Sequence, residues 1–158
     1  MALDINGELV EIALATGLPV WFGYSCKLSR DGETLYLYDG TDPQDGGDDG
    51  ERFASALRES LHEGLAAAGP MHCDMEATGL AIASLKTHWR GPVFAYPNSG
   101  HALQRRWQKS DVTTPTEFVE AARGWVAAGT QVVGGCCGIH PEHIAALSCS
   151  LGVKPSRE

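Results

Sequence analysis

The 158-residue sequence lacks several features that would assign it to a broad class of protein. It has few basic residues: 12 Lys and Arg stand against 20 Asp and Glu, and the net charge of -8 argues against a nucleic-acid or anionic-membrane partner. It has no apolar run long enough to span a bilayer, and no basic-then-apolar signal sequence. Because its five cysteines are odd in number and nothing indicates secretion, we expect reduced thiols in a cytoplasmic protein.

The sequence does contain alternating strand and helix patterns, which predict parallel βαβ units. With 43% hydrophobic residues it can bury one core, so residues 1–158 are most simply one domain. Phe53 and the three leucines that follow it at four-residue spacing indicate an amphipathic helix. Thr114 and Glu117 form a capping box, with Pro115 at the first helical position. We expect strands over 19–26, 70–73, 93–96 and 131–133, and helices over 7–16, 51–68, 76–89, 114–128 and 141–151.

Two further expectations concern packing and a loop. In the first expected helix Leu9, Ile12 and Ala13 share the apolar face, and in the third Leu80, Ala83 and Leu85 are expected to point inward. The segment 27–50 is a long loop, rich in Asp and Gly toward its end. Such a length inside a compact domain often belongs to an active-site lid, and a solvated loop is the plainer interpretation.

The residues with the most reactive side chains stand at the carboxyl ends of the expected strands. Cys26, Cys73 and Asn98 each close a strand, and the last strand runs into Cys136 and Cys137. In α/β barrels and open α/β sheets the active site forms at this edge. Zinc prefers thiolate sulfur, and a catalytic zinc site uses three protein ligands and leaves a fourth position open. The adjacent thiols therefore indicate a metal site, with Cys73 as the best candidate for the third ligand.

Two motifs resemble those of the zinc-dependent homocysteine S-methyltransferases. The first is the Gly-Gly-Cys-Cys-Gly run over 134–138, followed by Pro-Glu-His-Ile over 141–144. The second, upstream, is Tyr-Pro-Asn-Ser-Gly over 96–100. The resemblance extends over nearly the whole chain, and its parts stand in the family's order. It implies a TIM-type (β/α)8 barrel with zinc held by three cysteines, which are Cys73, Cys136 and Cys137 in this sequence.

The chain departs from that family in two respects. A complete barrel needs about 250 residues, so the resemblance implies only the C-terminal half, with about four parallel strands each followed by a helix. The missing half includes the acidic residues expected to hold the amino acid part of homocysteine. We expect it to come from a separate chain, from a second copy of this chain in a homo-oligomer, or from a longer parent protein. The family also usually has Asn before the first ligand cysteine, where this chain has His72.

The resemblance implies a methionine-forming methyltransferase. Zinc would lower the pKa of the homocysteine thiol and present it as a thiolate to a small methyl donor. We therefore expect no catalytic residue beyond the metal ligands. The donor is left open among a sulfonium, a betaine and a methylated pterin. Asn98 and Ser99 either line the substrate pocket or satisfy the backbone of their turn.

Other interpretations of these residues stay open. Because the acidic residues are missing, the chain could instead be a non-catalytic zinc-binding half-domain. The adjacent thiols are also compatible with a redox dithiol protein. Cys26 is interpreted as a plain buried cysteine. Because side chains alternate along a strand, His72 is expected to point away from Cys73 and to be a hydrogen-bonded interior histidine. His140 and His143 flank a helix start, where they are expected to cap the helix or lie at the surface.

Overall fold

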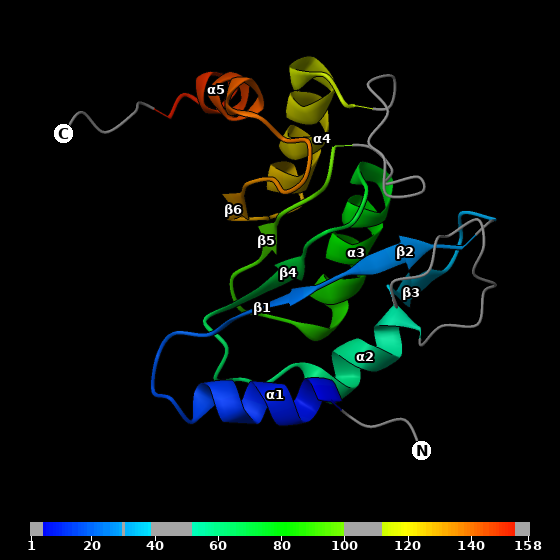
Figure 1. Ribbon diagram of the computed structural model, residues 1–158, viewed down its shortest axis with the longest axis vertical. Coiled ribbons are helices and arrows are strands. Elements are labelled where there is room, and N and C mark those ends of the chain that lie inside the picture. The colour runs from blue at the N-terminus through cyan, green and yellow to red at the C-terminus, as the bar shows by residue number, and fades with distance from the viewer. Residues whose placement is uncertain (1–4, 30, 39–51, 100–111, 154–158) are drawn as a thin grey trace.

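The computed structural model describes residues 5–29, 31–38, 52–99 and 112–153. Short strands and helices alternate along the chain (Figure 1). The strands are β1 (Trp21–Tyr24), β2 (Cys26–Leu28), β3 (Leu35–Leu37), β4 (Ala67–Pro70), β5 (Phe94–Ala95) and β6 (Val132–Val133). The helices are α1 (Ile5–Leu14), α2 (Phe53–Ser60), α3 (Met75–His88), α4 (Pro115–Ala127) and α5 (Pro141–Ser150).

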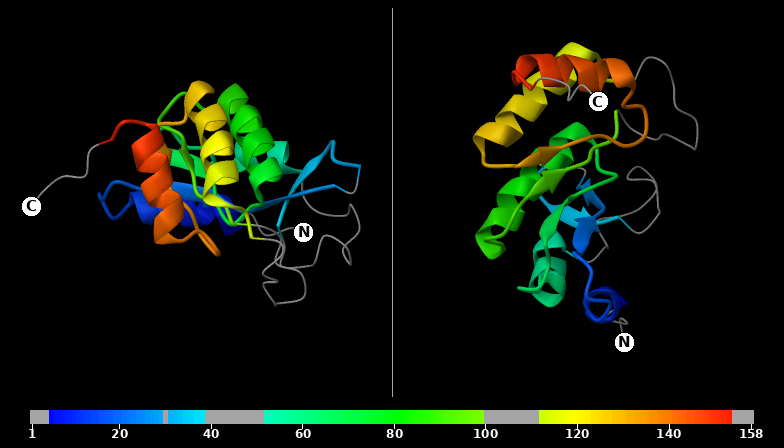
Figure 2. Two further views of the ribbon diagram at one scale, coloured as in Figure 1. Left: turned by 90° about the horizontal axis from the view of Figure 1, so that it is seen from above. Right: turned by 90° about the vertical axis from the view of Figure 1, so that its left-hand side faces the viewer.

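The four strands that alternate with these helices run parallel, in the order β1, β4, β5 and β6. Residue pairs join β1 to β4 and β5 to β6, and parallel bridges at Ala68–Val93 and Met71–Tyr96 join β4 to β5. Each helix contacts the next, from α1 through α5, so that the helices form a curved row beside the strands (Figure 2). The predicted order of parallel strands, each followed by a helix, is therefore confirmed. None of the helices described here is long and apolar enough to cross a membrane.

The core lies between the strands and this row of helices. Ala68 and Ala95 are fully buried, and they belong to the same apolar cluster as Leu57 of α2, Leu85 of α3 and Phe118 of α4. Small residues on the strands let the helices approach closely, while the larger side chains come from the helices. The core therefore fixes the helices on one side of the sheet.

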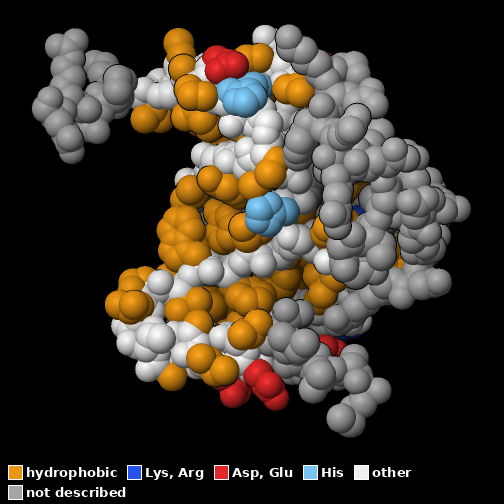
Figure 3. Space-filling model, in the orientation of Figure 1, with side chains coloured by type: hydrophobic (Ala, Val, Ile, Leu, Met, Phe, Trp, Pro, Cys, Tyr) orange, Lys and Arg blue, Asp and Glu red, His pale blue; other side chains and the backbone are white. Residues whose placement is uncertain are grey.

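The other side of the parallel strands carries exposed apolar side chains. Trp21 is 55% exposed, Tyr96 42% and Val132 41%. The Trp21 ring stacks on Phe94 at a centroid distance of 5.6 Å, across the strand between them. A hollow in the surface gathers hydrophobic side chains (Figure 3). Because side chains alternate along a strand, the sheet buries one side against helices and leaves the other open within the described residues.

Part of the expected loop over 27–50 is a hairpin. Strands β2 and β3 pair antiparallel, with Cys26 opposite Leu37. The turn between them has Gly32 in the left-handed region (φ 76°), and its amide donates to the carbonyl of Ser29. Glycine adopts this conformation without steric cost, which is why a tight hairpin forms here. The strand expected over 19–26 accordingly divides into β1 and the start of β2. The lid expectation depends on residues 39–51, which lie outside the described residues.

The helix expected over 51–68 is shorter than predicted. It ends at Ser60, where Leu61 becomes extended, and Ala67 already belongs to β4. The four-residue spacing of the leucines continues across this end because Leu65 is buried in the loop that follows, where it joins the same core. The strand expected over 70–73 is therefore displaced toward the N-terminus, to Ala67–Pro70.

The buried faces of two helices also differ from the predicted ones. Leu9 is 52% exposed and Ile12 66% exposed, whereas Val10 of the same helix is buried. In α3, Leu80 and Ala83 are exposed, while Leu85 is buried as predicted. Helix α1 carries apolar residues around most of its circumference, so its pattern does not specify which face packs inward.

The capping box at Thr114 is confirmed. The Thr114 hydroxyl accepts from the Glu117 amide (3.3 Å), and a Glu117 carboxylate oxygen accepts from the Thr114 amide (2.8 Å).

We expect Thr114→Ala to lower the free energy of unfolding by about 1 kcal/mol, measured by urea denaturation. The Thr114 hydrogen bonds hold the pKa of Glu117 below its usual value, so the contribution of this carboxylate is present at neutral pH and is lost on acidification through that lowered pKa. A urea midpoint for Thr114→Ala equal to that of wild type would contradict the expected contribution of the capping box.

Candidate metal centre

Backbone hydrogen bonds bring the ends of three strands together. The Asn98 amide donates to the Cys73 carbonyl (2.8 Å), and the Cys136 amide donates to the Pro97 carbonyl (2.7 Å). The Ser99 amide donates to the carbonyl of Cys137, also at 2.8 Å. The segments that follow β4, β5 and β6 therefore lie side by side at the carboxyl edge of the sheet. This is the edge at which the sequence places its reactive residues.

The adjacent cysteines lie at the rim of this edge. The Sγ atoms of Cys136 and Cys137 are 3.7 Å apart, with Cys136 half-buried and Cys137 exposed. Gly134 before them leaves space for the ring of Tyr96, which would lie 2.6 Å from a Cβ at this position. Gly138 after them adopts a φ of 75°. Burial raises the pKa of the Cys136 thiol, so in the absence of a metal this side chain is neutral at pH 7.

Cys73 is buried and its sulfur faces Cys26. The two Sγ atoms are 3.1 Å apart, and the Cys26 amide donates to the Cys73 sulfur at the same distance. The Cys73 thiol in turn donates to the carbonyl of Met71 (3.2 Å). The hydrogen bond with Cys73, together with burial, raises the pKa of Cys26 well above its usual value. Cys26 is buried, as the sequence indicates, but its contact with the candidate ligand Cys73 was not predicted.

His72 occupies a different position from the one expected. It follows the end of β4 and has a φ of 58°, and its side chain is exposed. Its Nδ1 lies 3.0 Å from the Sγ of Cys136. The expectation of an interior histidine is therefore wrong, because His72 lies beyond the end of β4 and its side chain is exposed.

Four of the five thiols form two pairs in the structure. One pair is Cys26 with Cys73, and the other is Cys136 with Cys137, which His72 contacts. In the part of the chain that the structure describes, no three His, Cys, Asp or Glu side chains form a group arranged to hold a metal. The role of Cys73, Cys136 and Cys137 as one ligand set therefore stays a prediction.

The donor atoms at this edge nevertheless suit zinc. Two sulfurs bound at about 2.3 Å in tetrahedral geometry stand about 3.8 Å apart, and the Cys136–Cys137 separation is 3.7 Å. Thiolate and imidazole are the ligands that zinc prefers in proteins. The backbone of Cys73 is already tied to this edge through Asn98. To join the other two thiols, its sulfur would have to turn from Cys26 toward the rim.

Asn98 and Ser99 both take part in the turn that holds the edge together. The Asn98 side-chain amide donates to the His72 carbonyl (3.1 Å), and the fully buried Ser99 hydroxyl lies 3.5 Å from the carbonyl of Thr113. The Oδ1 of Asn98 is buried and has no hydrogen-bond partner among the residues that the structure describes. Asn98 therefore keeps a free acceptor, and a substrate-binding role for it and for Ser99 stays a prediction.

The two histidines around the start of α5 have structural roles. The amide of His140 donates to Nδ1 of His143 (3.1 Å), and the buried His143 ring also contacts the carbonyl of Thr113 through Nε2 (2.8 Å). His143 also meets the edge of Phe118, at a centroid distance of 5.9 Å. The expected capping role at this helix start is confirmed.

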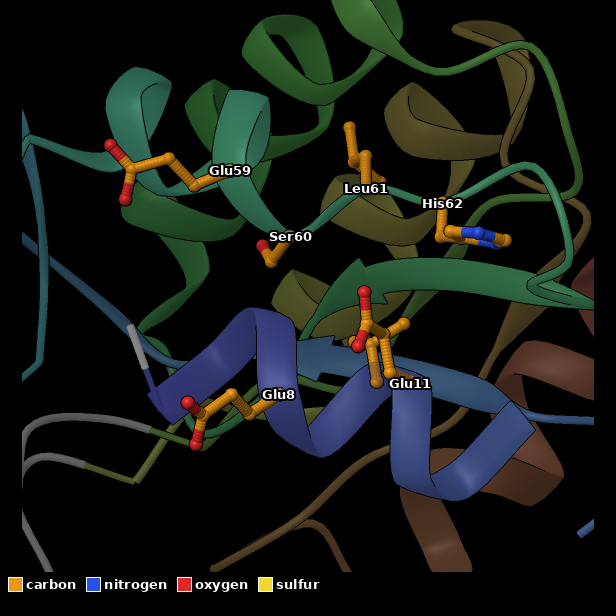
Figure 4. A pocket seen from close by; sticks show the side chains of 7 residues that line it. Glu8, Glu11, Glu59, Ser60, Leu61 and His62 are labelled. Carbon is orange, nitrogen blue, oxygen red and sulfur yellow. The ribbon is translucent and has the colours of Figure 1, made fainter. Parts of the chain in front are cut away.

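A separate hollow lies between α1 and the end of α2. Figure 4 shows Glu8 and Glu11 of α1 on one side of it, and Glu59, Ser60 and His62 on the other. Its carboxylates do not form a metal-binding group with its histidine among the residues described. The hollow therefore offers no second candidate metal centre.

The parallel strands are each followed by a helix, which defines an α/β protein. Its candidate functional residues are the thiols at the carboxyl edge of the sheet. A sequence profile described as Homocysteine S-methyltransferase matches residues 4–151, and the chain belongs to this family.

Two curated relatives are similar to this chain in sequence, and one solved structure is similar to it in fold. The chain is 28% identical over 142 residues to homocysteine S-methyltransferase 3 of Arabidopsis thaliana, covering 88% of this chain and 37% of the relative. It is 30% identical over 131 residues to homocysteine S-methyltransferase YbgG of Bacillus subtilis, covering 81% and 36%. The crystal structure of the metallated homocysteine methyltransferase MmuM from Escherichia coli matches 89% of this chain with a TM-score of 0.59 at 22% identity, over 39% of its own length. The chain thus spans about two fifths of the length of these proteins.

Proposed function

We propose that this chain is the C-terminal half of a TIM-type homocysteine-binding barrel, and that the completed barrel transfers a methyl group to homocysteine to form methionine. Residues 1–158 would then be one partial domain. The observation that carries the proposal is the set of hydrogen bonds that joins Cys73, Cys136 and Cys137 through the Pro97–Ser99 turn at one edge of the sheet. In a chain of this family, thiols gathered at the edge where α/β proteins form their active sites favour an enzymatic role.

Cys73, Cys136 and Cys137 are the proposed zinc ligands. Zinc bound there would supply a lowered pKa for the homocysteine thiol. Without metal the pKa of Cys136 is raised by burial, so the metal has to replace a proton at this sulfur, and its binding weakens as the pH falls. Three thiolates on a divalent ion leave a net negative charge, which keeps a bound substrate sulfur electron-rich.

The chain's own residues hold and orient this edge. Asn98 fixes the segment after β4 through the carbonyl groups of Cys73 and His72, and its free Oδ1 can accept a hydrogen bond from a bound amino acid. The buried Ser99 links the same turn to Cys137. We propose Asn98 and Ser99 as the substrate-side residues of this half. The methyl donor is a small molecule that this segment does not specify.

The uncovered side of the sheet supports the need for a second half. Trp21, Tyr96 and Val132 are exposed on the side opposite the helices. Such a surface is normally covered by protein. We propose that an N-terminal half covers this surface, either in the same parent protein or as a separate chain. A homo-oligomer is the alternative. We also propose that the protein is cytoplasmic and that its thiols stay reduced. A size measurement in solution distinguishes a monomer from an assembly of copies.

Zinc content and homocysteine binding test the proposal. We expect about one zinc per chain in protein purified without chelator. Calorimetry should then detect zinc-dependent homocysteine binding once the missing half is supplied. Zinc without homocysteine binding would instead indicate a non-catalytic zinc-binding half-domain. Absence of zinc, with loss of two hydrogens from Cys136 and Cys137 on mild oxidation, would indicate a dithiol redox protein.

A further inference from the structure

His72 is held in an unusual backbone conformation at the candidate metal centre. Its φ of 58° lies in the left-handed region, and it is the only non-glycine residue with positive φ among those described. Its amide donates to the Tyr96 carbonyl (3.1 Å), and its carbonyl accepts from the Asn98 side chain (3.1 Å). A branched or bulky residue rarely adopts this conformation without a reason in the surrounding structure. Here the segment after β5 imposes it from both sides of the residue.

This conformation directs the His72 ring to the cysteines. Nδ1 lies 3.0 Å from the Sγ of Cys136, which is itself 3.7 Å from the Sγ of Cys137. A nitrogen at about 2.05 Å and a sulfur at about 2.3 Å from one tetrahedral zinc stand about 3.6 Å apart. A small opening of the His72–Cys136 contact therefore gives the separation that two ligands of one zinc require. The imidazole is exposed, so it has room to move by this amount.

We propose that His72 is a fourth protein ligand of the metal centre, alongside the three cysteines. This inference rests on the proposed zinc site and adds a nitrogen to its sulfur ligands. Three cysteines alone leave one position open. With His72 in that position, a thiol substrate has to displace the imidazole in order to reach the metal.

The competing explanation is that His72 only forms a hydrogen bond with Cys136. The two explanations differ in the metal's coordination shell, which X-ray absorption spectroscopy at the zinc edge reports directly. With His72 as a ligand, the zinc form of the full chain contains a nitrogen at about 2.0–2.1 Å as well as sulfurs at about 2.3 Å, and scattering from the outer ring atoms identifies that nitrogen as imidazole and not water. Homocysteine added once the missing half is supplied should replace that nitrogen with a further sulfur.

Two substitutions remove the imidazole without requiring a new backbone conformation. His72→Gly suits a positive φ at no steric cost, and His72→Asn introduces a residue that tolerates this region. We expect both to lose the nitrogen from the zinc shell. Zinc affinity, measured by competition with a chromophoric chelator, should fall at least about tenfold, since even outer partners of ligands contribute that much. His88→Asn, at an exposed histidine near the end of α3, is the control and should change neither property.

The outcomes separate this inference from the proposed function. If wild-type zinc has a shell of sulfur and water only, and His72→Gly binds zinc as tightly as wild type, the inference is wrong while the cysteine site stands. If wild-type protein binds no zinc at all, both the inference and the proposed site are wrong. Because glycine relieves the strain at this position, His72→Gly should be at least as stable as wild type without metal, so weaker zinc binding reports the lost ligand and not unfolding.

Discussion

Cys136→Ala is expected to abolish zinc binding and, in protein assembled with its missing half, methyl transfer to homocysteine. Cys136 is the central residue of the candidate metal centre, because its sulfur contacts both Cys137 and His72 and its amide is anchored on Pro97. Activation of a thiol by a metal is worth several kcal/mol, so the rate should fall at least about 100-fold. Zinc per chain and methionine formation are the two measurements.

Cys149→Ala is the matched control for this prediction. Cys149 is an exposed thiol on α5, and its loss should leave both zinc content and rate unchanged. Cys136 is only half-buried, so removing its sulfur should leave the fold intact, and an unchanged circular dichroism spectrum verifies this. Methionine formation by Cys136→Ala at the wild-type rate would contradict the ligand assignment.

Cys73→Ala tests a different part of the same site. The sulfur of Cys73 meets Cys26 in the structure, so its contribution to a metal requires a change of side-chain orientation. In the proposed site, that change would also release the Cys26 thiol from its partner. Metal binding would then depend on a buried thiol pair that the sequence motif does not reveal.

The sequence predicts the parts of the fold that depend on local chemistry. The Thr114 capping box and the cap at His143 each use side chains within one helical turn, and both are found. The parallel order of strands and helices follows from apolar runs separated by helical patterns. The gathering of Cys73 and Cys136 at one edge follows from that order, because the carboxyl ends of parallel strands share an edge.

The errors arise where long-range contacts override a local pattern. The regular leucine spacing extends past the end of α2, since Leu65 is buried from a loop. His72 was placed by strand alternation, but hydrogen bonds to Tyr96 and Asn98 impose its left-handed conformation. The pairing of Cys73 with Cys26 depends on the register of β1 against β4, in which Tyr24 lies opposite Pro70. None of these contacts has a signal in the residues next to it.

Gly69→Ala is expected to destabilise the chain by about 3 kcal/mol or more, measured by urea denaturation. Gly69 is buried in β4, and a Cβ at this position would overlap the carbonyl of Phe94 on the neighbouring strand. Backbone atoms held in a ladder cannot move aside as a flexible side chain does. The two strands would have to separate, and the hydrogen bond between Cys73 and Asn98 at their ends would be lost with them.

Gly124→Ala provides the matched control, because the same substitution is expected to have the opposite effect. Gly124 lies on the exposed face of α4, where a Cβ would meet no atom within 4 Å. Alanine in a helix is favoured over glycine by about 0.5–1 kcal/mol, so this variant should be more stable than wild type. Neither glycine has a positive φ, so the comparison isolates the space around the new methyl group. If Gly69→Ala were as stable as Gly124→Ala, strands β4 and β5 could not be in the close contact that brings Cys73 to the candidate metal centre.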